Sequence, residues 1–145
     1  MLTTNGLLLP KMAFDLKAAG VQRVNISLDT MDPKCFHEIT RGGDVSTVIQ
    51  GVFRSLEAGL NPVKINVVVV RGFNTDELPS FLTLAKKYPL HVCFIELMPI
   101  GISSEQRKRF CSHSKNERTV RPERVRSHTG YPGRWTRRVC STKGL

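Results

Sequence analysis

The amino-acid sequence predicts an α/β fold in which about four parallel strands form part of a (β/α) barrel. Strand-like segments alternate with amphipathic helices over the first 100 residues, and right-handed crossovers turn such an order into a parallel sheet. Two of these strands carry polar residues on one side only. An open α/β sheet is covered by helices on both faces and needs apolar residues on both, whereas a barrel can enclose a polar lumen. The one-sided polarity therefore favours the barrel.

Size and charge divide the chain into two parts. Its 145 residues suffice for one domain, and it has no apolar run near the roughly 20 residues that a membrane span needs. Residues 1–100 contain 10 basic and 9 acidic residues, whereas residues 101–145 contain 12 and 3. The net charge of +10 therefore gives no indication that the folded part binds nucleic acid. We expect an incomplete barrel over residues 1–106 and a basic, disordered tail over residues 107–145, where no hydrophobic period continues.

The first strand and helix are predicted from turn and cap signals. Residues 1–6 are typical of the end of a strand that enters a turn. A helix is expected over residues 10–20, because Pro10 suits a first helical turn and Gly20 suits a helix end. A strand over residues 21–28 follows.

Two helices come next, each introduced by an aspartate. Asp32 followed by Pro33 predicts the start of a short helix that closes at Gly42. Asp44 predicts the start of a longer helix that ends at Gly59. Its apolar residues recur every three or four positions, as in an amphipathic helix: Val45, Val48, Ile49, Val52, Phe53 and Leu56.

The second half of the barrel segment repeats the strand–helix–strand order. Residues 62–70 are a β-branched run typical of a buried parallel strand. Asn74 or Thr75 could cap the next helix, which would hold Pro79 in its first turn. A last strand is expected over residues 91–98.

Polar residues alternate with apolar ones along two predicted strands. Asn25, Ser27 and Asp29 share one face of the first, and Lys64 and Asn66 share one face of the second. A lumen lined by these side chains predicts a polar site near the carboxyl ends of the strands, where barrel enzymes place their ligands.

Each candidate site residue also has a purely structural interpretation. Lys64 could lie near a sheet edge and extend its amino group to solvent. Ser27 and Asp29 could simply begin the turn before the next helix, and Thr3 could belong to an ordinary strand-exit turn. Met98 could fill the core rather than contact a ligand.

Several blocks of the sequence together resemble the molybdenum cofactor biosynthesis protein A family, the radical S-adenosylmethionine GTP 3′,8-cyclases. The resemblance covers essentially all of residues 2–100, with matching intervals between blocks. The blocks are Thr3-Thr4-Asn5-Gly6, residues 25–29, Asp32-Pro33, Phe36, residues 39–43, residues 58–66, Arg71-Gly72, Asn74 and residues 94–99.

The resemblance implies a fold, ligands and a reaction. The fold is an incomplete TIM-like radical SAM barrel. Thr3 and Lys64 would contact GTP, and Ser27 and Met98 would contact S-adenosylmethionine. Members of the family cleave S-adenosylmethionine at a 4Fe-4S cluster and use the 5′-deoxyadenosyl radical to convert GTP to the cyclic pyranopterin precursor. A second cluster helps to hold the guanine.

The chain departs from the family in its cysteines. The family holds its radical cluster through a C-x3-C-x2-C motif that is absent here. Cys35 in a helix and Cys93 on a strand are expected as buried thiols, and Cys111 and Cys140 lack the C-x2-C spacing of the second cluster. We therefore expect no catalytic residue and no metal ligand in this chain, and no activity of the chain alone. The expected partners are GTP as substrate and either a second copy of the chain, in a homodimer, or the missing remainder of the enzyme.

The basic tail suggests a second function of a different class. Arginines in residues 107–138 could contact the phosphates of nucleic acid or another acidic surface, with Trp135 stacking on a base. A solvated tail that binds nothing specific is the alternative. A zinc site from Cys111, His113, His128 and Cys140 has irregular spacing.

The location of the protein is predicted from the absence of two signals. The four cysteines do not form a secreted disulfide pattern, and no secretory signal is visible. We expect the cytoplasm, or the mitochondrial matrix if the source is eukaryotic.

Overall fold

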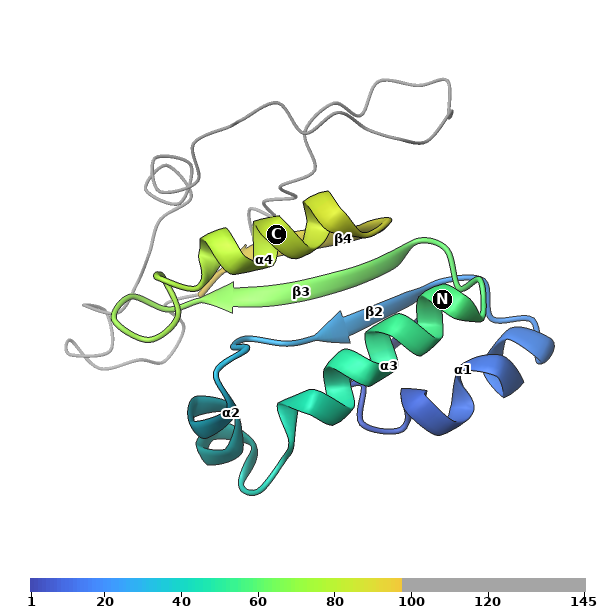
Figure 1. Ribbon diagram of the computed structural model, residues 1–145, viewed down its shortest axis with the longest axis horizontal. Coiled ribbons are helices and arrows are strands. Elements are labelled where there is room, and N and C mark those ends of the chain that lie inside the picture. The colour runs from blue at the N-terminus through green and yellow to red at the C-terminus, as the bar shows by residue number, and fades with distance from the viewer. Residues whose placement is uncertain (98–145) are drawn as a thin grey trace.

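The computed structural model describes residues 1–97, which form one parallel sheet with helices between the strands (Figure 1). The elements in chain order are β1 (Leu2–Thr4), α1 (Leu9–Ala18), β2 (Val24–Ser27), α2 (Pro33–Thr40), α3 (Val45–Glu57), β3 (Val63–Val69), α4 (Leu78–Lys87) and β4 (Leu90–Glu96). The strands lie in the order β1-β2-β3-β4, and each neighbouring pair is parallel. The predicted α/β class and the four parallel strands are confirmed.

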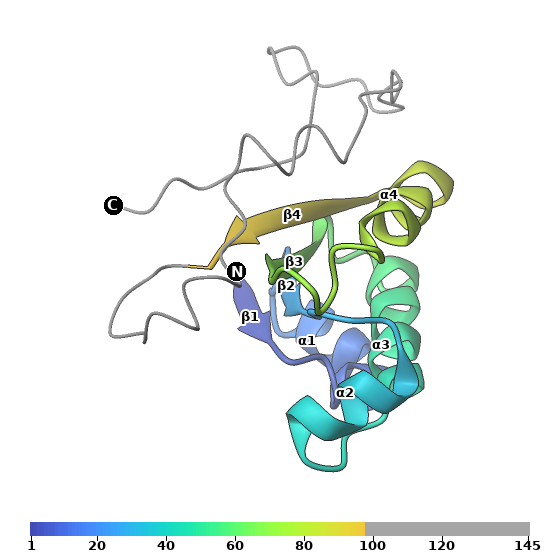
Figure 2. The same cartoon turned by 90° about the vertical axis from the view of Figure 1, so that its left-hand side faces the viewer.

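Helices cover one side of the sheet. Figure 2 shows α1, α3 and α4 together on that side. Along β3 the side chains alternate strictly between buried and half-buried, as the period of two in a strand requires. The same alternation in β2 leaves Val24 and Ile26 buried and Asn25 half-buried. This one-sided coverage agrees with the expected barrel segment.

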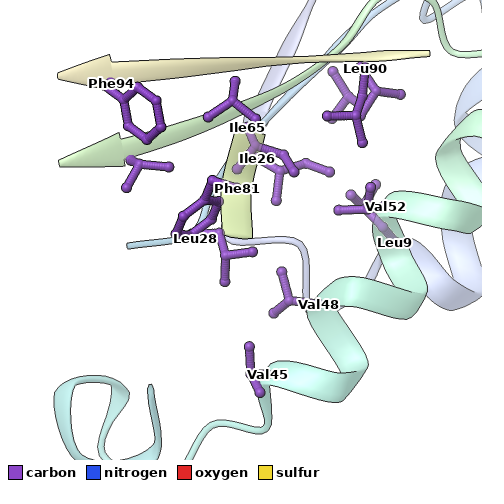
Figure 3. Packing of buried hydrophobic residues seen from close by; sticks show 14 of the residues in the cluster. Leu9, Ile26, Leu28, Val45, Val48, Val52, Ile65, Phe81, Leu90 and Phe94 are labelled. Atoms are coloured by element: carbon purple, nitrogen blue, oxygen red, sulfur yellow. The ribbon is translucent and has the colours of Figure 1, made fainter. Parts of the chain in front are cut away.

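The core lies between the apolar side of the sheet and the helices (Figure 3). Ile26 and Ile65 are neighbours in the register of β2 and β3, and both are fully buried. Phe81 of α4 meets Phe94 of β4 edge to face, with ring centroids 6.4 Å apart. Each fully buried side chain of this size contributes about 1.5–3 kcal/mol to folding. The amphipathic period of α3 is confirmed, because Val45, Val48 and Val52 join this core.

The helix starts follow the predicted caps with one exception. The Asp32 side chain accepts a hydrogen bond from the Cys35 amide at 2.8 Å, and the Asp44 side chain accepts one from the Ser46 amide at 2.9 Å. The prediction that Asn74 or Thr75 caps α4 is wrong. Glu77 is the residue before this helix, and no side chain caps the helix start. The Asn74 side chain is bonded to the ends of β2 and β3 instead.

Some predictions concern residues outside the described range. These are the boundary at residue 106, the tail over residues 107–145 with its nucleic-acid and zinc hypotheses, and Met98. Within residues 1–97, no helix is long and apolar enough to cross a membrane.

Helix α3 approaches the turn after β1 so closely that only a glycine fits. A Cβ atom on Gly51 would lie 2.7 Å from the carbonyl oxygen of Gly6 and 2.9 Å from the Cβ of Leu9. Gly6 itself has a φ of 83°, in the region that favours glycine. Both partners of this contact are backbone or core atoms, so neither can move without disturbing the packing.

We predict that Gly51→Ala destabilises the protein, opposite to the effect of alanine on helix propensity. Alanine stabilises the middle of an exposed helix by about 1 kcal/mol relative to glycine, but overpacking costs about 1–3 kcal/mol. Chemical denaturation should show a lower free energy of unfolding. The neighbouring exposed change Gln50→Ala should alter that free energy by less than about 0.5 kcal/mol. A stabilised Gly51→Ala variant would contradict the close approach.

Candidate functional site

The side of the sheet opposite the helices carries two aligned rows of polar residues. The strand register places Thr3, Asn25, Lys64 and His91 in one row across the four strands. Aligned residues of parallel strands point to the same side of the sheet. The next row, two residues further along the strands, contains Ser27, Asn66 and Cys93. We call Thr3, Asn25, Ser27, Lys64, Asn66 and His91 the polar face.

The polar face is more open than the helix-covered face. Thr3 and Ser27 are exposed, and Lys64 is half-buried, whereas Val63 and Ile65 on either side of it are fully buried. Lys64 and Ser27 therefore point away from the core, as the sequence predicted. A half-buried lysine with an accessible amino group can bind an anion.

The height of Lys64 along its strand differs from the prediction. Lys64 is the second residue of β3 and lies at the amino end of that strand, whereas Ser27 is the last residue of β2. The expectation that both lie near the carboxyl ends is correct for Ser27 only. The two rows are about 7 Å apart at about 3.3 Å per residue, so the site has two levels. The long flexible stem of lysine can span part of that interval.

Asn25 stands between Thr3 and Lys64 in the lower row. Its amide nitrogen lies 3.7 Å from the Met1 sulfur, and its Oδ1 atom is buried without a hydrogen-bond partner. Leaving a buried acceptor unpaired costs about 1–3 kcal/mol. Next to Lys64 there is thus one buried acceptor to which the described residues offer no donor.

Side chains tie the ends of β2 and β3 together above the upper row. The Asp29 carboxylate accepts a hydrogen bond from the Val68 amide at 2.8 Å. The Asn74 Nδ2 group donates to the backbone oxygens of Asp29 and Val68, at 2.7 and 2.8 Å, and its Oδ1 accepts from the Val70 amide at 2.8 Å. Asn74 is fully buried. Asp29 therefore has a structural role that was not predicted, because its side chain bonds to β3 rather than within the turn before the next helix.

A second connection joins the same two loops. The Glu77 carboxylate accepts hydrogen bonds from the Thr30 hydroxyl and, at 2.6 Å, from the Met31 amide. The Thr30 oxygen also accepts from the Asp32 amide at 3.0 Å. The segment between β2 and α2 is thus held by the segment before α4. The sequence does not reveal this role of Asn74 and Glu77, because nothing local indicates that a turn asparagine bonds to a strand end 45 residues earlier.

Burial and hydrogen bonds shift the pKa values of the carboxyl groups in opposite directions. Burial raises the pKa of Asp29 above its ordinary value of 3.8, and the Val68 amide opposes this only in part. Amide hydrogen bonds from Cys35 and Ser46 lower the pKa values of the capping residues Asp32 and Asp44. Relative to the unfolded chain, the fold therefore makes the charged form of Asp29 less stable and the charged forms of the two capping residues more stable.

The described cysteines do not fit an iron–sulfur cluster. Cys35 is half-buried on α2 and Cys93 is buried on β4, and neither forms a disulfide, so the expected burial is confirmed for Cys93 and wrong for Cys35. The hydrogen bond between the Cys35 side chain and Asp32 raises the pKa of the thiol, which opposes the thiolate form that a metal needs. Residues 1–97 contain no group of three His, Cys, Asp or Glu residues that could hold a metal ion.

Comparison with known proteins identifies relatives that match most of this chain. Residues 1–85 match the family model of the Radical SAM superfamily. Three curated relatives carry the name GTP 3′,8-cyclase. The relative from Syntrophomonas wolfei is 56% identical over 100 residues, covering 69% of this chain and 31% of the relative. The relative from Alkaliphilus oremlandii is 50% identical over 115 residues, covering 79% and 36%. The relative from Moorella thermoacetica is 55% identical over 103 residues, covering 71% and 32%.

The chain spans about a third of the length of the curated relatives it matches. Among solved structures, a radical SAM methyltransferase from Sphaerobacter thermophilus is similar with a TM-score of 0.60 and 20% sequence identity. That likeness covers 81% of this chain and 35% of the methyltransferase chain. At this identity it supports the fold alone.

We predict opposite pH dependences for two aspartate variants. Asp29→Asn keeps an oxygen acceptor for the Val68 amide and removes a buried charge. The raised pKa means that the stability contributed by the titration of Asp29 is present below 3.8 and lost as pH rises through the folded-state pKa. Asp29→Asn should therefore be more stable than the unchanged chain at pH 7, and this advantage should shrink in acid.

Asp44→Ala is the matched comparison. The lowered pKa of Asp44 means that its contribution is present above 3.8 and lost as pH falls through the folded-state pKa. This variant should be less stable at pH 7, with the deficit shrinking in acid. Urea denaturation between pH 3 and pH 7 measures both effects. An Asp29→Asn variant less stable than the unchanged chain at pH 7 would show that the buried charge stabilises the fold.

Proposed function

Since the chain belongs to the radical SAM superfamily, we propose that its polar face is part of a GTP 3′,8-cyclase site. In this proposal the lower row binds GTP through Thr3 and Lys64, and the upper row binds S-adenosylmethionine through Ser27. Met98, outside the described residues, is the second proposed contact to S-adenosylmethionine. The observation that carries the proposal is the register, which aligns Thr3 with Lys64 and sets Ser27 one row above them on the same side of the sheet.

The residues of the lower row suit a nucleoside triphosphate. The Lys64 ammonium group supplies three donors and a full positive charge for phosphate oxygens. The Thr3 hydroxyl, exposed two strands away, can donate or accept a hydrogen bond. Neighbouring strands are about 4.8 Å apart, so the backbones of the two residues are separated by about 10 Å, an interval that a nucleoside triphosphate can bridge.

The residue of the upper row suits S-adenosylmethionine. Ser27 is exposed at the carboxyl end of β2, where parallel α/β folds bind their ligands. Its hydroxyl can bond to the carboxylate or the ribose of S-adenosylmethionine. The cofactor supplies the hydrogen-abstracting chemistry when it is bound. The residues of this chain bind and orient the two ligands, and no described residue holds a 4Fe-4S cluster.

We predict that Lys64→Ala weakens GTP binding selectively. Loss of a charged hydrogen-bond donor costs about 1.5–3 kcal/mol, which corresponds to a roughly ten- to hundredfold higher Kd for GTP. The Kd for S-adenosylmethionine should change by less than about twofold, because Ser27 occupies the other row. Calorimetric titration of the 145-residue chain with each ligand measures both values.

Lys11→Ala is the control, because it removes the same charge from the exposed surface of α1. It should leave both dissociation constants unchanged. Equal losses of both ligands in Lys64→Ala, or an equal loss of GTP in Lys11→Ala, would contradict the assignment of Lys64.

We also predict that the 145-residue chain alone does not form the radical. Its four cysteines, at positions 35, 93, 111 and 140, lack the spacing of a cluster motif. Anaerobic reconstitution with iron and sulfide, followed by reduction with S-adenosylmethionine and GTP, should yield no 5′-deoxyadenosine. Stoichiometric cluster incorporation with turnover would show this prediction to be wrong.

A chimera provides the positive test of the proposed function. The 103 residues of the Moorella thermoacetica relative that match this chain can be replaced by the corresponding residues of this chain. The chimera should consume GTP and produce 5′-deoxyadenosine, and Lys64→Ala should reduce that activity. A soluble, cluster-containing chimera without activity, beside an active unmodified relative, would count against the proposal.

A further inference from the structure

Asn74 occupies an unusual position, since it is fully buried and yet belongs to neither a helix nor a strand. Its side chain makes three hydrogen bonds of 2.7–2.8 Å, all to backbone groups of the two strand ends. Two of the partners, Val68 and Val70, are at the end of β3, and the third is Asp29, just beyond β2. A buried amide with both its nitrogen and its oxygen satisfied in this way stabilises one particular geometry of these segments.

The need for such a residue follows from the unequal lengths of the two strands. β2 ends at Ser27, and the Leu28 amide still donates to the Asn66 oxygen at 3.0 Å. β3 continues to Val69, so Val68 lies beside no strand residue of β2. The Val68 amide donates a hydrogen bond to the Asp29 carboxylate, and the Val68 carbonyl oxygen accepts one from Asn74 Nδ2. These side chains replace the backbone partners that β2 would otherwise supply.

Asn74 therefore connects the two strands just beyond the upper row. Asp29 is two residues after Ser27, and Val68 is two residues after Asn66, the register partner of Ser27. By bonding to both carbonyl oxygens, one amide nitrogen holds the end of β2 against β3. Strand ends without such connections open locally at little cost in free energy.

We infer that Asn74 is a positioning residue for ligand binding at Ser27. It touches no ligand in this proposal and acts by fixing the backbone that carries the Ser27 hydroxyl. The inference rests on the proposed contact between Ser27 and S-adenosylmethionine. Lys64 and Thr3 lie in the other row, within the paired part of the sheet, so their geometry does not depend on this connection.

The test uses two variants of Asn74 in the 145-residue chain. Asn74→Asp is isosteric and replaces the donating Nδ2 group with an oxygen that faces two carbonyl oxygens. Asn74→Ser keeps one donor and is the milder change. Equilibrium dialysis with S-adenosylmethionine and with GTP should show a Kd for S-adenosylmethionine raised at least about tenfold in Asn74→Asp, and by a smaller factor in Asn74→Ser. The Kd for GTP should change by less than about twofold in both. Hydrogen exchange at the Leu28 amide, in the absence of ligand, should accelerate in the same order.

Ser55→Ala is the matched control for a loss of stability alone. Ser55 is fully buried on α3 and donates a hydrogen bond to the Gly51 carbonyl oxygen at 2.7 Å, remote from the polar face. Removing this bond should destabilise the fold without changing the ratio of the two dissociation constants. If Ser55→Ala shifts that ratio as far as the Asn74 variants do, or if the Asn74 variants weaken both ligands equally, Asn74 has only a general structural role.

Ser27→Ala separates this inference from the proposed function. The proposed function is overturned if the unchanged chain does not bind S-adenosylmethionine, or if Ser27→Ala binds it as tightly as the unchanged chain does. A loss in Ser27→Ala together with an unchanged ratio in both Asn74 variants overturns the positioning role alone. A selective loss in all three variants supports both.

Discussion

The pairing of β2 with β3 is the constraint on which the other features of this structure depend. Asn25 lies opposite Lys64, and Ile26 lies opposite Ile65, so one register decides both the polar face and the core. A slip of β3 by one residue would turn Lys64 toward the helices and move Val63 and Ile65 to the open side. Burying a lysine without a partner costs several kcal/mol, and exposing the valine and isoleucine forfeits about 1.5–3 kcal/mol each. The hydrophobic effect therefore determines where the proposed phosphate-binding charge points.

The sequence predicted which side chains share a face, because polar and apolar residues alternate along each of the two strands. A period of two along residues 24–29 and 63–67 identifies the two faces of each strand, and the caps Asp32 and Asp44 identify two helix starts. What alternation cannot supply is the offset between strands. The height of Lys64 relative to Ser27 depends on which residues pair, and the pairing is a tertiary property that the alternation within one strand does not define. The prediction of faces was therefore right, and the prediction that Lys64 lies at a carboxyl end was wrong.

The same distinction explains why Asn74 and Glu77 were not recognised as parts of the site's support. Near Pro79 and before an amphipathic stretch, an asparagine has the ordinary signature of a helix cap. Its actual partners belong to β2 and β3, and those partners need it because β3 is longer than β2. The tendency of asparagine to cap a helix competes here with its bonds to backbone groups at the strand ends, and the sequence does not show which backbone groups lack partners. The buried backbone prevails, since an orphaned carbonyl costs about 1–3 kcal/mol, comparable with or greater than the value of a typical cap.

The two levels of the polar face are consequently held by different kinds of interaction. The row of Thr3, Asn25 and Lys64 lies inside the sheet, where backbone ladders and the core beneath it fix every residue. The row of Ser27 lies where the ladder ends, and its support passes to the side chains of Asp29 and Asn74. The support at this junction comes from a small number of hydrogen bonds between side chains and backbone groups, beside the buried core residue Leu28. If the two proposed ligands bind at these two levels, the first meets a preformed surface, and the second meets a backbone whose order depends on a few buried hydrogen bonds. Ligand binding at the upper level would then also stabilise the end of β2, because a ligand that prefers the ordered geometry shifts the local equilibrium toward it.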